Sequence, residues 1–351
     1  MADARRGIAG AGNWIIDHLY ICDRWPQEET LSNILEEACG TGGAPYNCLL
    51  DVAKFGPPPT DDGTPGRAIP LEAVGLTGND ADGEFIRAQM AEHGIDASAL
   101  ASTDRAPTSY TNVMVVQATG RRTFFHNRGA NALFGPEHVN VRTIRARLLH
   151  FGYLLLLDRF DEPDAEFGTA AARLLKEVQD AGIETTIDVV SEDSDRFPQI
   201  VKPALRHTDY CILNEFEAGR TTGHDLRPGG RPDPKAIRAS SEALLRLGVR
   251  RLVCIHMPEG GYVRTAGGEE LWHPSLQLPP GYIRGGAGAG DAFCAGLLYG
   301  LHERWDLERT MRLAVTAAAV CLSDASCTGA MRDLESTLAL ADRYPFQPSA
   351  F

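Results

Sequence analysis

Hydrophobic residues follow two patterns along the chain, and the two patterns alternate. Short apolar runs, interpreted as buried strands, are separated by longer segments whose apolar residues recur as on one face of a helix. The strand-like runs lie at 8–12, 71–78, 146–154, 184–190, 209–214 and 251–256. The helical segments lie at 45–55, 84–94, 165–182 and 234–248. Because strands that alternate with helices form a mostly parallel sheet covered on both faces, the pattern predicts a doubly wound α/β fold.

Two stretches depart from this alternation. Residues 111–126 alternate between apolar and polar positions across a turn at Gly120, as the two strands of a hairpin do. Residues 18–26 are also strand-like, and no helical segment follows before the next loop. We interpret both stretches as a small β-sheet that projects from the main domain and forms a lid over the carboxyl edge of the large sheet. Ordinary edge hairpins are the alternative that the pattern leaves open.

The charge of the chain limits its partners. The 351 residues include 34 basic and 47 acidic ones, a formal net charge of −13. Nucleic acids and anionic membrane surfaces attract basic proteins, so we expect neither as a partner. A small anionic ligand requires backbone N–H groups or a metal ion to hold it on such a chain. The length suffices for two ordinary domains or for one large α/β domain with an appendage.

Targeting and redox signals are weak. The N-terminal segment 1–12 lacks the apolar core of a signal peptide. The most apolar run, 148–157, is about half of the ~20 residues that span a bilayer. The eight cysteines are scattered singly, without a CxxC pair or metal-ligand spacing, which is typical of reduced thiols. We therefore predict a cytoplasmic protein, and we expect Cys294 to face the core.

Of two common phosphate-binding motifs, one is absent and the other is incomplete. The chain contains no GxxxxGK[ST] sequence and therefore no P-loop of that type. Gly10 and Gly12, at the end of the first predicted strand, begin a GxGxxG pattern, but Ile15 occupies the third glycine position. A dinucleotide-binding site of the Rossmann type is therefore disfavoured.

A glycine-rich segment, IRGGAGAGDAFCAG at 284–297, indicates a different anion site. Its glycines precede Asp291 at the start of a predicted helix, where free N–H groups and the helix dipole bind anions without a lysine. We expect Gly288, Ala289 and Gly290 to hold phosphoryl oxygens, and Asp291 to accept the proton of an attacking hydroxyl. The alternative is that Asp291 only caps the helix.

A second polar pair lies at the start of another predicted helix. Asn214 and Glu217 are three residues apart, so they share one face of that helix directly after the strand at 209–214. Taken alone, such a pair is better explained as a helix cap. Beside a phosphate site it also predicts Mg²⁺ binding, because Mg²⁺ prefers oxygen ligands and bridges phosphate groups.

Five segments together resemble the ribokinase-like, or PfkB, family of carbohydrate kinases. In chain order they are the first signature at Gly42, Gly43, Asn47, Ala53 and Gly56, a strand-turn-helix step at 73–83, a lid return at 120–131, an NxxE motif at 214–217 and the second signature at 288–296. Each segment is weakly specific, whereas the ordered set is highly specific. The resemblance implies one ribokinase-like domain over residues 1–351, with a lid formed by about 17–40 and 106–128.

The resemblance also implies the chemistry. Members of the family transfer the γ-phosphoryl group of ATP, with Mg²⁺, to a primary hydroxyl of a sugar beneath a β-lid. A nucleoside kinase is an alternative, because the GNxxxD pattern at 12–17 resembles the adenosine-kinase branch. A catalytically silent sugar or nucleotide sensor is another, although the retained Asp291 argues against it. A homodimer formed through the lid is compatible with the resemblance.

Individual residues receive roles from the resemblance. Asp291 is the expected base, and the segment from Gly288 to Gly290 is the expected anion hole. The residues expected to bind the acceptor are Asn13, Asp17, Gly42, Gly43, Asn47 and Arg128. Those expected on the nucleotide side are Asp188, Asn214, His256 and Gly261, with Mg²⁺ held through water by Asn214 and Glu217. Each of four residues also has a structural alternative. Asp17 would be a surface acid and Asn47 an amide inside a helix. Arg128 would form an ion pair with a neighbouring acid, and His256 would have a structural role at the end of its strand.

Two positions depart from the family pattern. Gly285, Gly286 and Ala287 stand where the family usually has an Asp-Thr pair. The loop therefore lacks a carboxylate that would hold a monovalent cation, and we expect activity that does not depend on potassium. The His-Met-Pro sequence at 256–258 stands where the family tends to have Thr-x-Gly, so the identity of the phosphoryl donor is less firmly predicted than the transfer itself.

Overall fold

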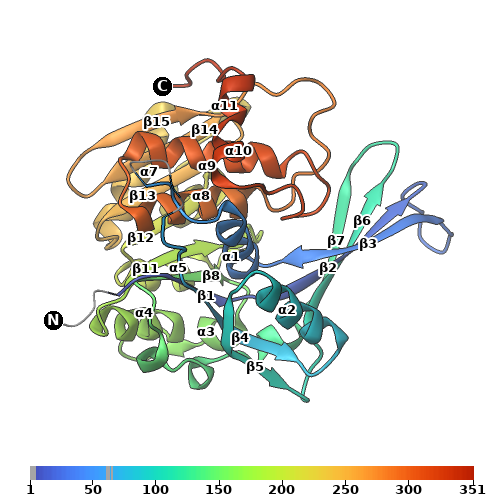
Figure 1. Cartoon of the computed structure of the whole chain (residues 1–351), viewed down its shortest axis with the longest axis horizontal. Helices are drawn as coiled ribbons and strands as arrows, with labels where there is room; N and C mark the ends of the chain where they lie inside the picture. The colour runs from blue at the N-terminus through green and yellow to red at the C-terminus, as the bar shows by residue number, and fades with distance from the viewer. Residues whose placement is uncertain (1–4, 61–63, 65) are drawn as a thin grey trace.

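The computed structural model describes residues 5–60, 64 and 66–351. Residues 1–4, part of the segment without a signal-peptide pattern, lie outside this description, as do 61–63 and 65. The predicted large sheet is present within the described residues (Figure 1). Its strands, in spatial order, are β15 (Glu270–Pro274), β14 (Gly260–Thr265), β13 (Leu252–Met257), β12 (Tyr210–Asn214), β11 (Glu184–Val189), β8 (Leu148–Leu154), β1 (Ile8–Gly12), β4 (Leu71–Gly78) and β5 (Asp96–Thr103). Pairing is parallel from β13 to β5, whereas β14 and β15 add an antiparallel edge that the hydrophobic pattern did not predict.

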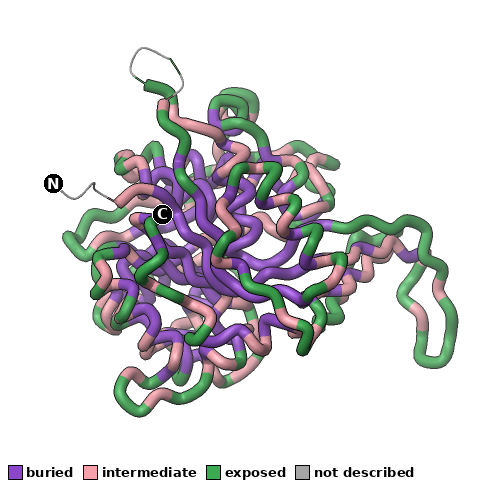
Figure 2. Tube along the Cα trace, turned by 60° about the horizontal axis from the view of Figure 1, so that its bottom comes forward, coloured by how far each residue is buried: buried purple, intermediate pink, exposed green. Residues whose placement is uncertain are grey.

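Helices cover both faces of this sheet, as the doubly wound prediction requires (Figure 1). One face packs against α1 (Ala44–Phe55), α2 (Ala81–Glu92), α8 (Ala289–Glu303) and α9 (Leu307–Cys321). The other packs against α4 (Ala170–Asp180), α5 (Phe197–Leu205), α6 (Glu215–Thr222) and α7 (Pro234–Leu247). Successive strand residues point to opposite faces, so Ile8 of β1 joins the first apolar core and Ala9 the second. Figure 2 shows the buried strands between these layers. None of the described helices is both long enough and apolar enough to cross a bilayer.

The remaining elements are short. They are α3 (Asp158–Asp161), α10 (Leu334–Leu338), α11 (Leu340–Arg343), the strand pair β9 (Pro163–Asp164) and β10 (Gly168–Thr169), and 3₁₀ turns at Gly129–Ala132, Pro136–His138, Val141–Thr143 and Pro228–Gly230. The helix predicted at 165–182 begins only at Ala170. Residues 165–167 form the turn between β9 and β10 instead. The side chain of Thr169, the last residue of β10, caps the helix by accepting from the N–H of Ala172 at 3.2 Å.

The predicted small sheet projects from one side of the main domain (Figure 1). Its strand order is β3 (Ile34–Gly42), β2 (Ile15–Cys22), β6 (Ser109–Val116) and β7 (Arg122–Asn127). β6 and β7 form the expected hairpin, with Gly120 in the left-handed region at φ 65°. The strand expected at 18–26 begins and ends earlier, as β2. The chain then turns back and pairs with it as the antiparallel strand β3, which the hydrophobic pattern did not predict. The first six residues of β3 are exposed, so no apolar alternation marks that strand (Figure 2).

The small sheet is attached to the centre of the large one. Only Asn13 and Trp14 separate β1 from β2, and the buried Trp14 donates from Nε1 to the main-chain oxygen of Val74 at 3.0 Å. At the same end of the small sheet, where Ile15 pairs with Gly42, β3 runs through Gly43 directly into α1. Both connections lie at the carboxyl edge of the parallel strands, which is where such folds bind ligands.

Candidate active site

A cavity of about 610 Å³ lies at the carboxyl edge of the large sheet, beneath the small sheet. The ends of β8, β11, β12 and β13 and the first turns of α1, α6 and α8 contribute to its wall. The predicted site residues in the lining are Asp17, Gly42, Gly43, Asn47, Asp188, Asn214, Glu217, His256, Gly288, Gly290 and Asp291. The small sheet adds Thr111, Phe124 and His126. Tertiary folding thus brings together residues that lie far apart in the chain.

Asp291 lies in the first turn of α8, and two donors hold its carboxylate. Nδ2 of Asn47 donates to Oδ2 at 2.7 Å, and the hydroxyl of Tyr153 donates to Oδ1 at 2.8 Å. The N-cap of α8 is Gly288, in the left-handed region at φ 79°. The interpretation of Asp291 as the cap is therefore wrong, and its two oxygens contact α1 and β8 instead.

The environment of Asp291 changes its acidity. Burial raises the pKa of Asp291 to about 6, and the charge of Asp188 adds to the rise. The hydrogen bonds from Asn47 and Tyr153 act in the opposite direction. A carboxyl group with this pKa is mostly ionised at neutral pH and accepts a proton more readily than an exposed one. Asp291 therefore has the protonation properties that a general base needs.

The glycines before Asp291 permit a close approach of the backbone to its neighbours. A Cβ atom on Gly288 would lie 2.6 Å from Cβ of Cys327, and one on Gly290 would lie 3.3 Å from Cε1 of His256. No side chain of the cap residue satisfies the first N–H groups of α8. Such N–H groups, with the helix dipole behind them, form the kind of anion site that the sequence predicts.

Asn47 and Asp17 flank the turn between β3 and α1. Thr41 donates from its hydroxyl to Oδ1 of Asn47 at 2.6 Å, which turns the NH₂ group of Asn47 toward Asp291. A Cβ atom on Gly42 would lie 2.7 Å from Oδ1 of Asp17, so this carboxylate requires glycine beside it. Burial raises the pKa of Asp17 to about 7, although a hydrogen bond with Thr111 lowers it. Asp17 is therefore not a plain surface acid, and Asn47 is not merely an amide inside a helix.

Tyr153 is a site residue that the sequence did not predict. It stands near the carboxyl end of β8, within the strand expected at 146–154, and its hydroxyl contacts Asp291. Ser191, just beyond β11, was missed as well and lines the same cavity. Their positions at the carboxyl ends of predicted parallel strands could have identified both residues, because polar side chains at these ends lie together at one edge of the sheet.

Asn214 and Glu217 form a capping box at the start of α6. Oδ1 of Asn214 accepts from the N–H of Glu217, and Oε2 of Glu217 accepts from the N–H of Asn214, both at 2.9 Å. Oε1 of Glu217 accepts from the Ser191 hydroxyl at 2.7 Å. Burial raises the pKa of Glu217 to about 8. The capping interpretation is confirmed, and because both side chains also line the cavity, their Mg²⁺ role stays a prediction.

A second cavity, of about 580 Å³, shares Asn214, His256 and Gly290 with the first. The rest of its lining is mostly apolar and includes Met257, Pro258, Leu276, Leu278, Ile283, Ala289, Phe293, Val315, Ala318, Ala319 and Leu322. His256 stacks on Phe293 with ring centroids 5.0 Å apart, and burial lowers the pKa of His256 to about 4. The imidazole is therefore neutral near pH 7 and does not attract phosphate by charge.

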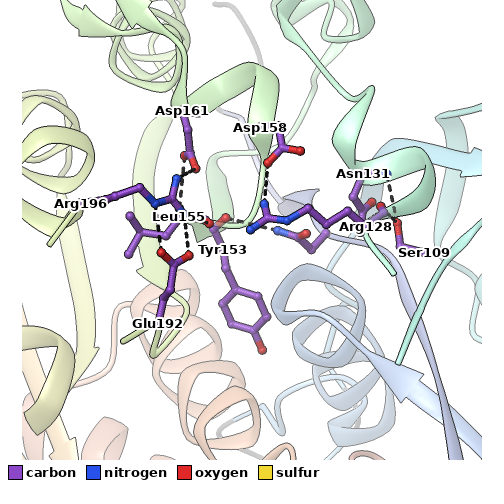
Figure 3. Close-up of polar contacts among 10 residues, drawn as sticks. Ser109, Arg128, Asn131, Tyr153, Leu155, Asp158, Asp161, Glu192 and Arg196 are labelled. Atoms are coloured by element: carbon purple, nitrogen blue, oxygen red, sulfur yellow. Dashed lines mark hydrogen bonds and ion pairs between the residues drawn. The ribbon is translucent and has the colours of Figure 1, made fainter. Parts of the chain in front are cut away.

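Three predicted residues lie outside both cavity linings. Arg128 forms an ion pair with Asp158 at 2.5 Å, the alternative expected for it, and the ring of Tyr153 points away from this pair (Figure 3). Asn13 is buried and donates from Nδ2 to the main-chain oxygen of Tyr153 at 3.2 Å. A Cβ atom on Gly261 would lie 2.6 Å from Cε of Met311, so this glycine serves packing.

Comparison with known protein families matches residues 11–334 to the family described as pfkB family carbohydrate kinase. The chain belongs to the pfkB family of carbohydrate kinases. This pfkB chain is 26% identical over 276 residues to a ribokinase of Arabidopsis thaliana, an alignment that covers 77% of the chain and 67% of the relative. It is 23% identical over 316 residues to an ATP-dependent ribose-1-phosphate kinase of Halopiger xanaduensis, with coverage of 89% and 90%.

The fold agrees with this membership. The solved structure of Arabidopsis thaliana ribokinase complexed with ribose and ATP matches the pfkB chain with a TM-score of 0.75 at 21% identity. The match covers 96% of this chain and 98% of that one. The resemblance and the fold class predicted from the sequence are thus confirmed, and the chain is a kinase of the sugar or nucleoside type.

Proposed function

We propose that the chain transfers the γ-phosphoryl group of ATP to a primary hydroxyl of a sugar. The observation that supports this most strongly is the geometry of Asp291, a buried carboxylate held by Asn47 and Tyr153 beside the first N–H groups of α8. The acceptor oxygen forms a bond to the γ-phosphorus as its proton passes to Asp291, and the bond from that phosphorus to the departing ADP oxygen breaks. Membership of the pfkB family supports the same chemistry.

The acceptor side of the proposal rests on polar groups around Asp291. Asp17 and Asn47 place a carboxylate and an amide in one wall of the cavity, and both types of group bind sugar hydroxyls. Thr111 and His126 of the small sheet hydrogen-bond to each other at 3.1 Å and line the same cavity. Closure of the small sheet would exclude water from the acceptor, as lids do in other enzymes.

A nucleoside is the second candidate acceptor. Phe124, on β7, lines the cavity although 57% of its surface is exposed, and Ile15 lies in the same lining. An aromatic ring available at the edge of a cavity can stack on a nucleobase, which a free sugar lacks. This observation keeps the nucleoside alternative open to a direct test.

The donor side of the proposal rests on the second cavity. Its apolar lining suits an adenine ring, and its shared wall at Asn214, His256 and Gly290 leads to the start of α8. The triphosphate would run along this wall, so that its terminal phosphate meets the N–H groups near Asp291. Because His256 is neutral, the backbone and Mg²⁺ would have to balance the phosphate charge.

Asn214 and Glu217 fit an Mg²⁺ ion that is held through water. Both present oxygen atoms to the cavity, and oxygen is the donor type that Mg²⁺ prefers. Oε1 of Glu217 already accepts hydrogen bonds from Ser191 and Asn214, which favours an indirect contact over direct ligation. When bound, Mg²⁺ supplies positive charge to the phosphate groups.

One assay tests the proposed function. ADP release is measured with Mg·ATP against a panel of sugars and a panel of nucleosides, with Asp291→Asn as the catalytic control. Turnover with a sugar supports the proposal, and turnover restricted to nucleosides favours the second candidate. Ligand-dependent thermal stabilisation without ADP release from any compound would contradict both and indicate a silent sensor.

We expect Glu217→Gln to raise the Mg²⁺ concentration for half-maximal rate by about tenfold above pH 8. Burial raises the pKa of Glu217 to about 8, so above that pH its carboxylate gives the ion's water shell a negative partner that glutamine lacks. Glutamine retains an acceptor oxygen for the N–H of Asn214, but its NH₂ group replaces Oε1, which accepts from Ser191 and from Nδ2 of Asn214. A modest fall in melting temperature is therefore expected as well. Glu84→Gln, in the first turn of α2 and outside the cavity lining, is the control. An unchanged Mg²⁺ profile with a lower melting temperature would restrict Glu217 to its capping role.

We expect residues 15–22 and 109–127 to gain protection from amide hydrogen exchange when the acceptor binds, because lid closure removes their backbone from water. The edge strand β15, on the far side of the large sheet, is the internal control. Equal protection with and without acceptor would mean that the small sheet is a fixed structure.

The homodimer predicted to form through the lid stays a prediction. Three side chains of the small sheet and its loop offer apolar surface for it, each at least 50% exposed: Trp25, Phe124 and Phe125.

A further inference from the structure

Three metal-binding side chains converge in the core behind the first cavity. Cys48 of α1, His150 of β8 and Cys294 of α8 are all buried, and their ligand atoms lie within 4.8 Å of one another. Sγ of Cys294 is 3.9 Å from Nε2 of His150. The sequence shows no metal-ligand spacing here, because each residue comes from a different element. Cys294 faces the core, as expected, but it also lines the cavity.

The ring of His150 is oriented for ligation. Its Nδ1 lies 2.9 Å from the hydroxyl oxygen of Thr186, a residue of the neighbouring strand β11. With the proton on Nδ1, the ring donates to Thr186 and presents the Nε2 lone pair to Cys294. Histidines that bind metals are commonly held in this way by a partner on the other ring nitrogen.

Asp188 supplies a fourth group. Its Oδ2 lies 3.7 Å from Nε2 of His150, and its Oδ1 is buried without a hydrogen-bond partner among the described residues. Only 8% of Asp188 is exposed, and it lines the cavity together with Cys294. The cavity therefore provides an access route, and Oδ2 of Asp188 lies beside the imidazole of the Cys48, His150 and Cys294 cluster.

We propose that Cys48, His150, Cys294 and Asp188 bind one Zn²⁺ ion. Ligand atoms about 2.0–2.3 Å from a tetrahedral zinc ion lie roughly 3.5 Å from one another. The ligand atoms of Cys48, His150 and Cys294 lie within 4.8 Å of one another and Oδ2 of Asp188 lies 3.7 Å from the imidazole, so binding requires the side chains to move inward by about 1 Å. Two thiolates, an imidazole and a carboxylate select zinc over Mg²⁺, which prefers oxygen ligands alone. Binding converts both thiols to thiolates and releases their protons to solvent. This site is distinct from the Mg²⁺ position at Asn214 and Glu217.

The test is a titration of the reduced full-length chain with Co²⁺ and then Zn²⁺, with saturating Mg²⁺ present throughout. We expect one Co²⁺ per chain, with the absorption bands of tetrahedral cobalt and of charge transfer from two thiolates, displaced by one equivalent of Zn²⁺. Cys48→Ser and Cys294→Ser should each halve the charge-transfer intensity. Each should also weaken Zn²⁺ binding by at least about tenfold. Loss of a residue that only hydrogen-bonds to a metal ligand already costs about this much, so loss of a ligand should cost no less.

Two further variants separate ligation from folding. Cys321→Ser is the matched control, because Cys321 is a buried thiol that hydrogen-bonds to main-chain oxygens, as Cys48 does. It should leave metal binding unchanged. Thr186→Val should keep the charge-transfer absorption of both thiolates. It should weaken Zn²⁺ affinity about 10–100-fold, because His150 loses its hydrogen-bond partner. It provides a test that does not depend on the folding of the cysteine variants.

Three outcomes would overturn the proposal. One is Co²⁺ binding to the wild-type chain without thiolate charge transfer, or no binding at all. Another is a loss of affinity in Cys321→Ser equal to that in Cys294→Ser. The third is wild-type affinity in Thr186→Val. None of these outcomes bears on phosphoryl transfer, so failure of the zinc site and failure of the proposed function are distinguishable.

Discussion

Asp291→Asn is expected to lower kcat by about 10²–10⁴-fold while acceptor affinity changes little, because the variant loses its proton acceptor and keeps its shape. The geometry favours a clean result. The amide oxygen of the new side chain can accept from Asn47, and its NH₂ group can donate to the hydroxyl of Tyr153, which acts as donor or acceptor. The hydroxyl hydrogen of Tyr153 then loses its carboxylate acceptor, so a modest fall in stability is expected beside the loss of kcat. Steady-state kinetics and acceptor binding measured on the same preparation test both parts.

Asp51→Asn is the matched control for this variant. Asp51 is also a fully buried carboxylate, on α1, but it does not line the cavity. Burial keeps its pKa well above the ordinary value, so an uncharged side chain resembles its native state. Its kcat should remain close to that of the wild type. If Asp291→Asn also retained wild-type kcat, Asp291 would be a structural residue and the proposed mechanism would be wrong.

Asp17→Asn is expected to stabilise the protein more strongly as the pH rises. Burial raises the pKa of Asp17 from 3.8 to about 7, so the folded chain retains a proton that the unfolded chain releases between these values. The stability that this carboxyl contributes is therefore present below pH 3.8 and is lost as the pH rises toward 7. The full shift corresponds to about 4 kcal/mol in the free energy of unfolding. Asparagine carries no such proton, so its advantage over the wild type should be near zero at pH 4 and largest at pH 8.

Urea unfolding of wild type and variant at several pH values measures this difference directly. Asp195→Asn, at an exposed position, is the control and should show no pH-dependent advantage. A constant difference between wild type and Asp17→Asn across the range would mean that Asp17 is not held protonated by the fold. Under the proposed function, the same variant should also raise the KM for the acceptor, because the hydroxyl-binding carboxylate is lost.

Local sequence determined the classes of the elements and the start of α8. Alternating strand and helix patterns predicted the doubly wound sheet, because apolar periodicity reports which side of an element is buried. The glycines before Asp291 predicted a helix start with free N–H groups, and Gly288 is its cap. The hairpin at 111–126 was visible for the same reason, since its alternation and its turn at Gly120 lie within one short stretch.

Tertiary structure alone decided what the side chains contact. Asn47 reaches Asp291 across 244 residues, and Tyr153 reaches it across 138. The sequence indicated neither bond, because they depend on the order of strands in the sheet. It also left undecided whether Asp291 caps α8 or acts as a base. The cluster of Cys48, His150 and Cys294 is the extreme case, in which three singly scattered residues meet because their elements pack together. Periodicity records the burial of each segment, whereas a site requires the relative placement of several segments, and that placement is set by packing across the whole fold.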